Sequence, residues 1–331
     1  MSILLDAAQL PAIAAHLTHL KWIAPDESLL SATIPGQGNM NYTLRIRTSF
    51  RSFILKQSRP YVEKYPQIPA PKERVLIEGQ FYDLIYPEEV LRTFIPAVSG
   101  IDPENSIMML EDLGDATDYT YLYQRDKVLP PQDAAELVRF LSVLHTRYTR
   151  VQVEPPITNR GMRALNGEHI FRYPLMEANG FDLDQVTPGL QAVAMRFKTD
   201  SALKEKVASL EAVYQADGNT LLHGDYYPGS WLRTLEGVKV IDPEFCFLGP
   251  AEFDLAVMLA HLQMAGQPQS LLDLVINAYG RPAGFDADLL RHLVGVEIIR
   301  RLIGLAQLPL PQSLAEKESL LDSAYAMIMT A

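Results

Sequence analysis

The sequence contains little cysteine, and it has no hydrophobic run that approaches the ~20 apolar residues needed to cross a bilayer. Its single cysteine, Cys246, cannot form an internal disulfide, so a reducing compartment is expected. The neighbours Phe245 and Phe247 predict a buried thiol rather than a nucleophile. The first residues also lack the basic and apolar regions of a secretory signal. We therefore expect a cytoplasmic protein that does not bind membranes.

Basic residues are in the minority as well. Lys+Arg 29 against Asp+Glu 40 give a formal net charge of −11. Proteins that bind the phosphate backbone of nucleic acids usually carry a basic face, so nucleic acid is excluded as the main partner. The 331 residues suffice for one large domain or for two lobes with a substantial core. A small molecule is the expected partner, and the sequence leaves open whether the chain is a monomer or a homodimer.

The first third of the chain shows mainly β patterns. Residues 72–85 have the apolar face of an amphipathic helix, and residues 6–20 also carry apolar positions at helical spacing. The other patterns are strand-like and lie at residues 42–46, 52–56, 91–96 and 107–110. Residues 1–112 are therefore expected to form a small β-rich lobe.

After residue 112 the pattern becomes helical. Helical spacing covers residues 132–147, 188–215, 252–265, 286–306 and 312–329, and short strands are expected at 221–222, 231–232 and 238–241. The sequence thus predicts an α+β fold with a small β-rich lobe at 1–112 and a larger helical lobe at 113–331. A cleft between two such lobes is a usual place for a ligand.

A glycine-containing segment lies between the first strand-like stretches. Gly36 and Gly38 would let backbone N–H groups approach a phosphate closely, and Asn39 and Asn41 could add side-chain donors. The alternative is a simple hairpin turn, because short glycine loops are common.

Lys56 ends the next strand-like stretch, and Glu78 lies on the helix pattern that follows. A strand lysine can bind nucleotide phosphates when a carboxylate orients it. The order of glycine loop, strand lysine and helix glutamate is that of a kinase nucleotide lobe. The alternative is an edge-strand lysine with a solvated glutamate, which is also a common arrangement.

Two acidic clusters flank a turn at Gly237, and each follows an apolar strand pattern. Asp225 belongs to the first, where a tight turn after the strand would present its carboxylate. Asp242 and Glu244 form the second, and in an extended chain both would point to one side, which suits one or two Mg²⁺ ions. Phosphoryl transfer to a hydroxyl needs a carboxylate near the attacking oxygen and metal ions on the phosphates.

These motifs resemble the kinase-like phosphotransferase family that includes aminoglycoside and choline kinases, and within it the methylthioribose kinase branch. The resemblance covers nearly the whole chain, and its most specific parts are the Asp-Pro-Glu-Phe run at 242–245 and the Arg-Arg-Leu-Ile-Gly-Leu-Ala run at 300–306. It implies that Asp225 is the catalytic base, that Asp242 and Glu244 bind the metal, and that Asp254 is a structural carboxylate.

The resemblance also implies a bilobal protein-kinase-like fold, with ATP and Mg²⁺ as cofactors. The expected reaction is phosphorylation of a hydroxyl of a small sugar, 5-methylthioribose or a related pentose. Adenine would bind the main chain of the hinge at Met109, Glu111 and Leu113. Arg300 and Arg301 would contact the sugar, although the plainer alternative is that both are solvated or paired with acids such as Glu297.

The chain departs from its relatives at two places in the first acidic cluster. Ser230 stands where many relatives have an asparagine that binds metal. Methylthioribose kinases resemble this chain in having the serine. The Tyr226-Tyr227-Pro228 stretch replaces their Leu-His-Thr. The alternatives are a kinase for an aminoglycoside or an amino alcohol, and a pseudokinase-like protein that holds a nucleotide without turnover.

Overall fold

The computed structural model describes residues 3–36, 38, 40–151 and 153–330. The chain divides into two compact units. Unit 1 comprises Met1–Ala116 and Lys239–Glu244, and unit 2 comprises Thr117–Val238 and Phe245–Ala331. The short segment Lys239–Glu244, with two of the acidic residues that the sequence singled out, belongs to unit 1 although it is far from the rest of that unit in the sequence.

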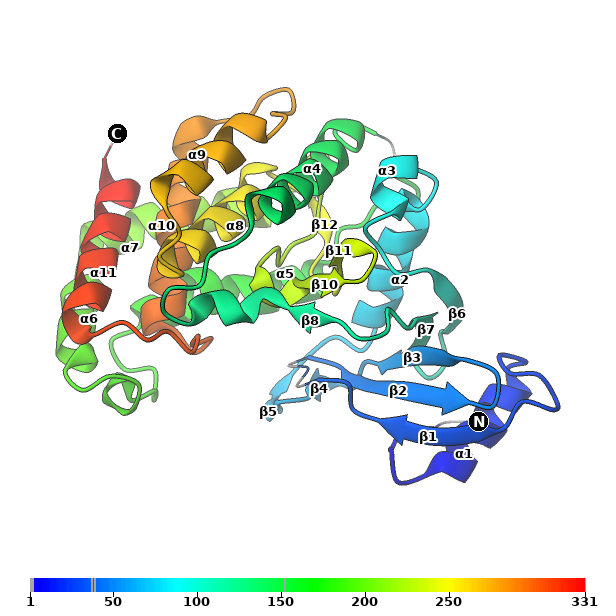
Figure 1. The fold of residues 1–331 in the computed structure, drawn as a ribbon. Coiled ribbons are helices and arrows are strands. Elements are labelled where there is room, and N and C mark those ends of the chain that lie inside the picture. Colours follow the sequence, from blue (N-terminus) through cyan, green and yellow to red (C-terminus); the bar gives the residue numbers. More distant parts are fainter. Residues whose placement is uncertain (1–2, 37, 39, 152, 331) are drawn as a thin grey trace. The chain divides into compact units, whose positions relative to one another are not determined.

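Unit 1 is built on an antiparallel sheet of five strands in the order β1-β2-β3-β7-β6 (Figure 1). Burial alternates along β2, where Leu44 and Ile46 enter the core and the residues between them are more exposed, as expected for a half-buried strand. Leu17 of helix α1 belongs to the same core. The bounds are α1 Leu10–His19, β1 Leu29–Thr33, β2 Tyr42–Thr48, β3 Ser52–Gln57, β6 Val98–Asp102 and β7 Ile107–Glu111.

Helix α2 (Arg74–Ile85) packs on β6 and β7 of this sheet, and a short hairpin of β4 (Tyr61–Val62) and β5 (Tyr65–Pro69) precedes it. The predicted strand at 91–96 is wrong, because the chain forms a helical turn, α3 (Glu89–Arg92), and enters β6 only later. The carboxylate of Glu88 caps that turn by accepting a hydrogen bond from the Leu91 N–H at 2.8 Å.

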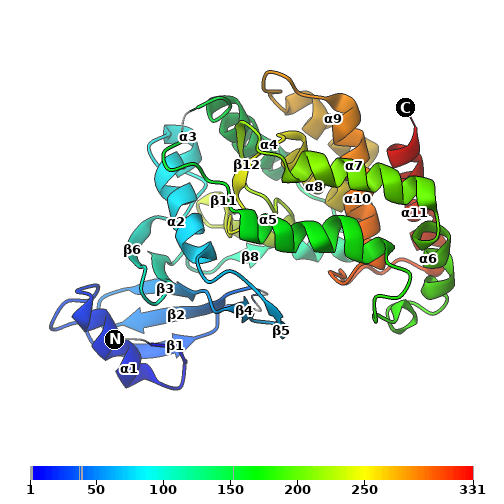
Figure 2. The ribbon, with the colours of Figure 1, turned by 180° about the vertical axis from the view of Figure 1, so that it is seen from behind.

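Unit 2 is mainly helical, and helix α10 packs against both α8 and α11. Helix α8 is buried on nearly every side, as expected for a helix in the middle of a core. Figure 2 shows α5 and α7 from behind, where the two helices are in contact. The bounds are α4 Pro131–Arg147, α5 Arg160–Gly167, α6 Leu190–Lys198, α7 Ser201–Gln215, α8 Glu252–Met264, α9 Gln269–Ala278, α10 Ala287–Ile303 and α11 Leu314–Met329. No helix within the described ranges combines the length and apolar character needed to span a membrane.

The helix predicted at 188–215 is two helices, α6 and α7, which are separated at Thr199–Asp200. The carboxylate of Asp200 accepts a hydrogen bond from the Leu203 N–H at 2.9 Å and so begins a new helix. Helices α5 and α9 were not predicted, and α5 continues into a π-helical turn at Glu168–Arg172.

Short strands precede and follow the first acidic cluster in the sequence, and one of them runs from unit 2 into unit 1 at Val238–Lys239. Strand β9 (Thr220–Leu222) pairs antiparallel with β12 (Phe247–Gly249). Strand β10 (Trp231–Thr234) pairs with β8 (Thr117–Asp118) and leads through a turn at Gly237, with φ +110°, into β11 (Gly237–Val240). The short strands expected at 221–222, 231–232 and 238–241 are therefore confirmed. Cys246, which directly precedes β12, is buried, as predicted.

Candidate active site

Lys56 is the centre of a charge cluster in unit 1. Its Nζ lies 2.6 Å from Glu78 Oε2 and 2.6 Å from Asp242 Oδ1. Strand β3 holds the lysine with only 4% of its surface exposed, and α2 presents a fully buried Glu78. The predicted ion pair between the strand lysine and the helix glutamate is therefore present.

Asp242 is the exposed carboxylate of this cluster, with 48% of its side chain accessible. Its backbone has φ +64°, so the extended conformation that the sequence analysis assumed for Asp242 and Glu244 is wrong. Aspartate is among the few residues that adopt this left-handed region with some frequency. The main-chain N–H of Asp242 donates a hydrogen bond to the Tyr82 hydroxyl at 3.2 Å, which helps to hold the turn.

Glu244 lies in the same cluster but is buried. Its Oε2 accepts a hydrogen bond from Asn41 Nδ2 at 2.7 Å and lies 3.5 Å from the Nε of Arg74. Arg74 Nε also donates to Asn41 Oδ1 at 2.8 Å, so both ends of the Asn41 amide are engaged. Asn41 was predicted to donate to a phosphate, whereas the described contacts use its amide to orient Glu244.

Arg74 connects several parts of unit 1, although the sequence analysis gave it no role. The side chain is fully buried, and its guanidinium donates to the main-chain oxygens of Met40 at 2.7 Å and Tyr61 at 3.2 Å. The available signal was its spacing, because a residue four positions before Glu78 lies on the same face of α2. Arg74 thereby holds the end of the glycine segment and Glu244 together.

Acidic side chains outnumber basic ones in this cluster. Three carboxylates, those of Glu78, Asp242 and Glu244, share Lys56 and Arg74 as cations. Burial raises the pKa of Glu78 to about 8, and burial also raises the pKa of Glu244. Although burial opposes it, Asp242 and Glu78 raise the pKa of Lys56, so the lysine stays charged.

The donor set of this cluster fits a Mg²⁺ ion. Mg²⁺ prefers oxygen ligands and is usually held by one or two carboxylates together with waters and substrate phosphates. Among the described residues no three His, Cys, Asp or Glu side chains gather as a complete metal site. Asp242 is the accessible carboxylate of the set and would be the first to meet a divalent cation.

The glycine segment was predicted to offer free backbone N–H groups to a phosphate, and one of them is already used. Nothing would crowd a side chain at Gly36, and the Gly38 N–H donates to the Gly36 oxygen at 3.1 Å. Asn39 lies outside the described residues. Binding of phosphate by this segment stays a prediction.

The predicted hinge residues occupy different positions in unit 1. Met109 is in the middle of β7, between β3 and β6, and its side chain belongs to the core. The Glu111 N–H already donates to the Ala97 oxygen at 2.9 Å. Leu113 follows the end of β7 and is half-buried. Of the three residues, Leu113 therefore has the main chain best suited to hydrogen-bond an adenine.

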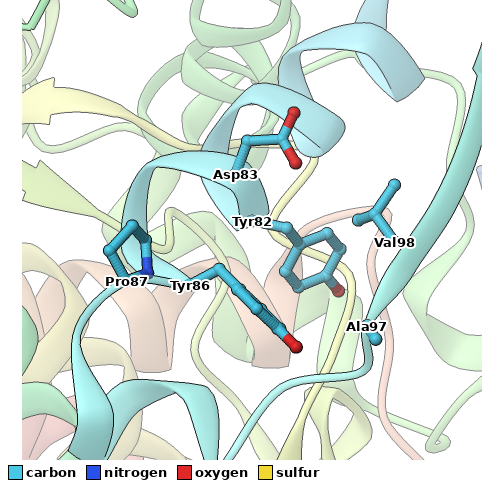
Figure 3. A pocket seen from close by; sticks show the side chains of 6 residues that line it. All are labelled: Tyr82, Asp83, Tyr86, Pro87, Ala97 and Val98. Atoms are coloured by element: carbon cyan, nitrogen blue, oxygen red, sulfur yellow. The ribbon is translucent and has the colours of Figure 1, made fainter.

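A cavity in unit 1 has a volume of about 230 Å³. It is lined by Tyr82, Asp83, Tyr86, Pro87, Ala97 and Val98 (Figure 3). None of the predicted site residues lines it. Tyr82 is nevertheless the residue whose hydroxyl accepts the hydrogen bond from Asp242. This tyrosine thus links a wall of the cavity to the predicted metal ligand.

Asp225 is presented by a tightly held loop in unit 2. The two carboxylate oxygens of Asp254 accept hydrogen bonds from the main-chain N–H groups of His223 at 2.6 Å and Gly224 at 2.9 Å. Gly224 has φ +86°, and a Cβ there would come within 2.1 Å of the Phe245 oxygen, so only glycine fits. The structural role implied for Asp254 is confirmed by these contacts.

The residues after Asp225 stabilise the same loop. The buried Tyr226 donates to the Leu137 oxygen at 2.9 Å and stacks on Phe140. The Ser230 hydroxyl donates to the main-chain oxygen of Asp225 at 2.9 Å. Ser230, which replaces a metal-binding asparagine of many relatives, therefore supports the backbone of Asp225.

The two arginines of α10 lie near Asp225 and are both paired with Glu297. Arg301 Nε is 2.6 Å from Glu297 Oε1, and its second nitrogen is 3.4 Å from Asp225 Oδ1. Arg300 is 3.0 Å from Glu297 Oε2 and donates to Asn166 Oδ1 at 3.1 Å. Burial raises the pKa of Asp225, and the two arginines partly oppose this effect. The pairing with Glu297 that the sequence analysis left open is present, next to the predicted base.

The chain is similar to proteins named methylthioribose kinase. The chain is 31% identical to a methylthioribose kinase of Exiguobacterium sibiricum, over 70% of this chain and 61% of that protein. It is 28% identical to a methylthioribose kinase of Yersinia pseudotuberculosis, over 89% of this chain and 84% of that protein. The match spans about three fifths of the length of the Exiguobacterium relative, and 58% of a Bacillus cereus methylthioribose kinase.

Solved structures show which fold this is. The choline kinase LicA from Streptococcus pneumoniae aligns with a TM-score of 0.54 at 12% identity, over 97% of this chain and 99% of that one. A microcompartment-associated aminopropanol kinase aligns with a TM-score of 0.51 at 16% identity, over 96% and 95%. The predicted α+β, kinase-like fold is thereby confirmed. Residues 31–291 match the model of the phosphotransferase enzyme family, and this chain belongs to that family.

Proposed function

We propose that this chain is an ATP-dependent kinase that phosphorylates a hydroxyl of a small neutral sugar, 5-methylthioribose or a related pentose. The observation that carries the proposal is Lys56, which is held between Glu78 and Asp242 in a sheet-and-helix unit. That set of side chains is suited to phosphoryl transfer. The family match and the relatives named methylthioribose kinase support it.

The residues of unit 1 would bind the nucleotide. Lys56, oriented by Glu78, would donate to phosphate oxygens, and the amides around Gly36 and Gly38 would hold the end of the phosphate chain. The main chain near Leu113 would bind the adenine. Mg²⁺, when bound at Asp242 and Glu244, neutralises charge on the phosphates. Most of the rate gain would come from positioning and charge neutralisation.

The residues of unit 2 would bind and activate the acceptor. Asp225 would orient the sugar hydroxyl and accept its proton during transfer. The Asp254 carboxylate and the Ser230 hydroxyl fix the backbone on both sides of Asp225, so its carboxylate has a defined position. Arg301 donates toward Asp225 and offers further N–H groups to neighbouring sugar oxygens.

Charge in unit 2 favours a neutral acceptor. Asp225 and Glu297 are matched by Arg300 and Arg301, so these four side chains have no surplus negative charge. An aminoglycoside or another polycation needs a pocket in which carboxylates predominate. A neutral pentose with a thioether fits the balanced set better.

The test is an ATP-consumption assay with Mg²⁺ and a panel of acceptors: methylthioribose, ribose, choline and an aminoglycoside. We expect methylthioribose to give the highest kcat/KM and a product heavier by one phosphoryl group. Preferred phosphorylation of choline or the aminoglycoside would overturn the substrate. Nucleotide binding without turnover of any acceptor would overturn the kinase and favour a binding protein.

A further inference from the structure

Glu297 is a buried carboxylate on α10 that bonds several side chains at once. It accepts from Arg300 and Arg301, one turn further along the same helix, and from the imidazole of His261 on α8. Only 2% of its surface is exposed, yet the two arginines hold its pKa well below the usual range despite burial. Glu297 therefore stays charged and joins both arginines to α8.

The hydrogen-bonding roles around His261 follow from its neighbours. Burial lowers the pKa of His261 to about 4, so the ring is neutral near pH 7. Its Nε2 lies 3.1 Å from Glu297 Oε1, and because a carboxylate only accepts, this nitrogen carries the proton. Its Nδ1 then accepts from the Tyr123 hydroxyl at 2.5 Å. The His261 ring therefore bridges the Tyr123 hydroxyl and the Glu297 carboxylate by hydrogen bonds.

The two arginines have different surroundings. Arg301 spans the two carboxylates Glu297 and Asp225, and its guanidinium lies over the ring of Tyr227, 5.1 Å from the centroid. Arg300 instead points to Asn166, whose own amide donates to a tyrosine hydroxyl. Arg301 therefore lies at the predicted base Asp225, whereas Arg300 contacts Glu297 and Asn166.

We propose that Glu297, supported by His261 and Tyr123, is a positioning residue that fixes Arg301 against Asp225, and that Arg300 serves this support rather than the acceptor. The proposal rests on the proposed kinase function for its meaning in catalysis. Its physical content is the geometry of one buried carboxylate that sets the direction of a guanidinium. Each contact in the chain from Tyr123 to Asp225 lies within unit 2.

Removal of the Glu297 charge would leave the buried arginines without their common partner. Asp225 would then be the remaining carboxylate that faces Arg301, and its proton would be lost more easily. The titratable and charged groups that face Asp225 in unit 2 are Arg301, Arg300, Glu297, His223, Tyr123 and Tyr214. Of these, Glu297 is a negative charge that raises the pKa of Asp225, so its loss lowers that pKa.

The experiment compares the full-length wild type with Glu297→Gln, which keeps the shape and removes the charge. We expect kcat to fall by about 10- to 100-fold at unchanged KM for ATP, because a displaced guanidinium no longer orients the reacting groups. We expect the Asp225 carboxyl to titrate at lower pH by carbon NMR, with Asp225→Asn identifying its signal. Glu297→Asp keeps the charge, so Asp225 should titrate nearly as in the wild type.

Each result is decisive. An unchanged Asp225 titration in Glu297→Gln would overturn the positioning role even in an active kinase. A shifted titration in a protein without any phosphorylation activity would retain the positioning role and overturn the proposed function. If Glu297→Gln fails to fold, Arg301→Lys and Arg300→Lys replace it. The first should lower kcat at least about tenfold more than the second, because only Arg301 reaches Asp225, and equal losses would overturn the proposal.

Discussion

The two units each contain a buried network of charges, and the networks differ in balance. In unit 1 three carboxylates share two cations, whereas in unit 2 Asp225 and Glu297 are matched by two arginines. Burial raises the pKa of Glu78 to about 8, while the arginines hold the pKa of Glu297 well below its ordinary value. The same residue type is thus poorly stabilised as an anion in one unit and well stabilised in the other.

The difference teaches what each network is suited to bind. A cluster in which burial leaves carboxylates poorly stabilised as anions gains from a cation, and Asp242 is the exposed carboxylate that a cation could reach. A neutral, rigid network gains little from another charge but can orient uncharged hydroxyl groups. The two networks therefore agree with a division into a nucleotide–metal part and an acceptor part, which stays a proposal.

The largest expected effect tests the unit 2 network. Asp225→Asn should lower turnover by roughly 10² or more, the usual scale for a positioned acid–base group, because the amide cannot accept the proton. Binding of Mg·ATP should stay within a few-fold of wild type, since its ligands belong to unit 1. Steady-state kinetics measure turnover, and nucleotide titration measures the affinity for Mg·ATP. Near wild-type turnover would reject Asp225 as the base.

The next effect tests the unit 1 network. Asp242→Ala should weaken Mg²⁺-dependent nucleotide binding at least about tenfold, ~1.4 kcal/mol, because it removes the accessible charged oxygen. Calorimetric titration with and without Mg²⁺ measures it.

Glu244→Gln is the matched variant, since it keeps shape and loses charge beside Arg74. It should also weaken metal-dependent binding, because Ser230 supplies no side-chain amide in place of the usual asparagine. Unchanged Mg²⁺ dependence in Glu244→Gln would make Glu244 a purely structural partner of Asn41 and Arg74.

A smaller effect is expected from the hydrogen bond between Tyr82 and the predicted metal ligand Asp242. Tyr82→Phe removes the acceptor of the Asp242 N–H and should weaken Mg·ATP binding a few-fold, in line with ~1 kcal/mol for one hydrogen bond. Tyr86→Phe, on the same wall of the cavity, is the control and should leave binding unchanged. Equal affinities of wild type and Tyr82→Phe would show that the hydroxyl does not support the turn.

The smallest effect concerns the pH dependence of stability, which should differ in sign between Glu78 in unit 1 and Glu297 in unit 2. The raised pKa of Glu78 means that the folded state holds its proton between pH 4.5 and about 8, so this residue lowers stability as pH rises through that range. The lowered pKa of Glu297 has the opposite sign, and its contribution is present above pH 4.5 and lost on acidification. Melting temperatures measured from pH 4 to 9 should therefore fall less between pH 4.5 and about 8 in Glu78→Gln than in wild type. A parallel decline in both proteins would contradict the raised pKa.

Local patterns in the sequence determined most of the elements. Apolar spacing predicted α2, α4, α8, α10 and α11 closely, because each buries one face or all of its surface. The same reasoning missed the break between α6 and α7, where one Asp200 side chain caps a new helix. It also took 91–96 for a strand, because an apolar run is ambiguous until a cap such as Glu88 and the burial of Leu91 decide it.

The chemistry of the candidate site was likewise contained in the sequence as residue types. The order of the glycine segment, Lys56 and Glu78 predicted the ion pair, and the glycine before Asp225 predicted a tight turn. These features depend on neighbours along the chain or on a familiar order of motifs. The sequence therefore determined which residue types the candidate site contains.

Only the tertiary structure decided how those residues pair. Asn41 reaches Glu244 across 203 positions, and Arg301 reaches Asp225 across 76, separations over which no local pattern carries information. The left-handed backbone of Asp242 and the hydrogen bond between His261 and Glu297 also depend on elements brought together by packing. Burial then sets the charge of each group, because the free energy of an ion depends on what surrounds it rather than on its place in the chain.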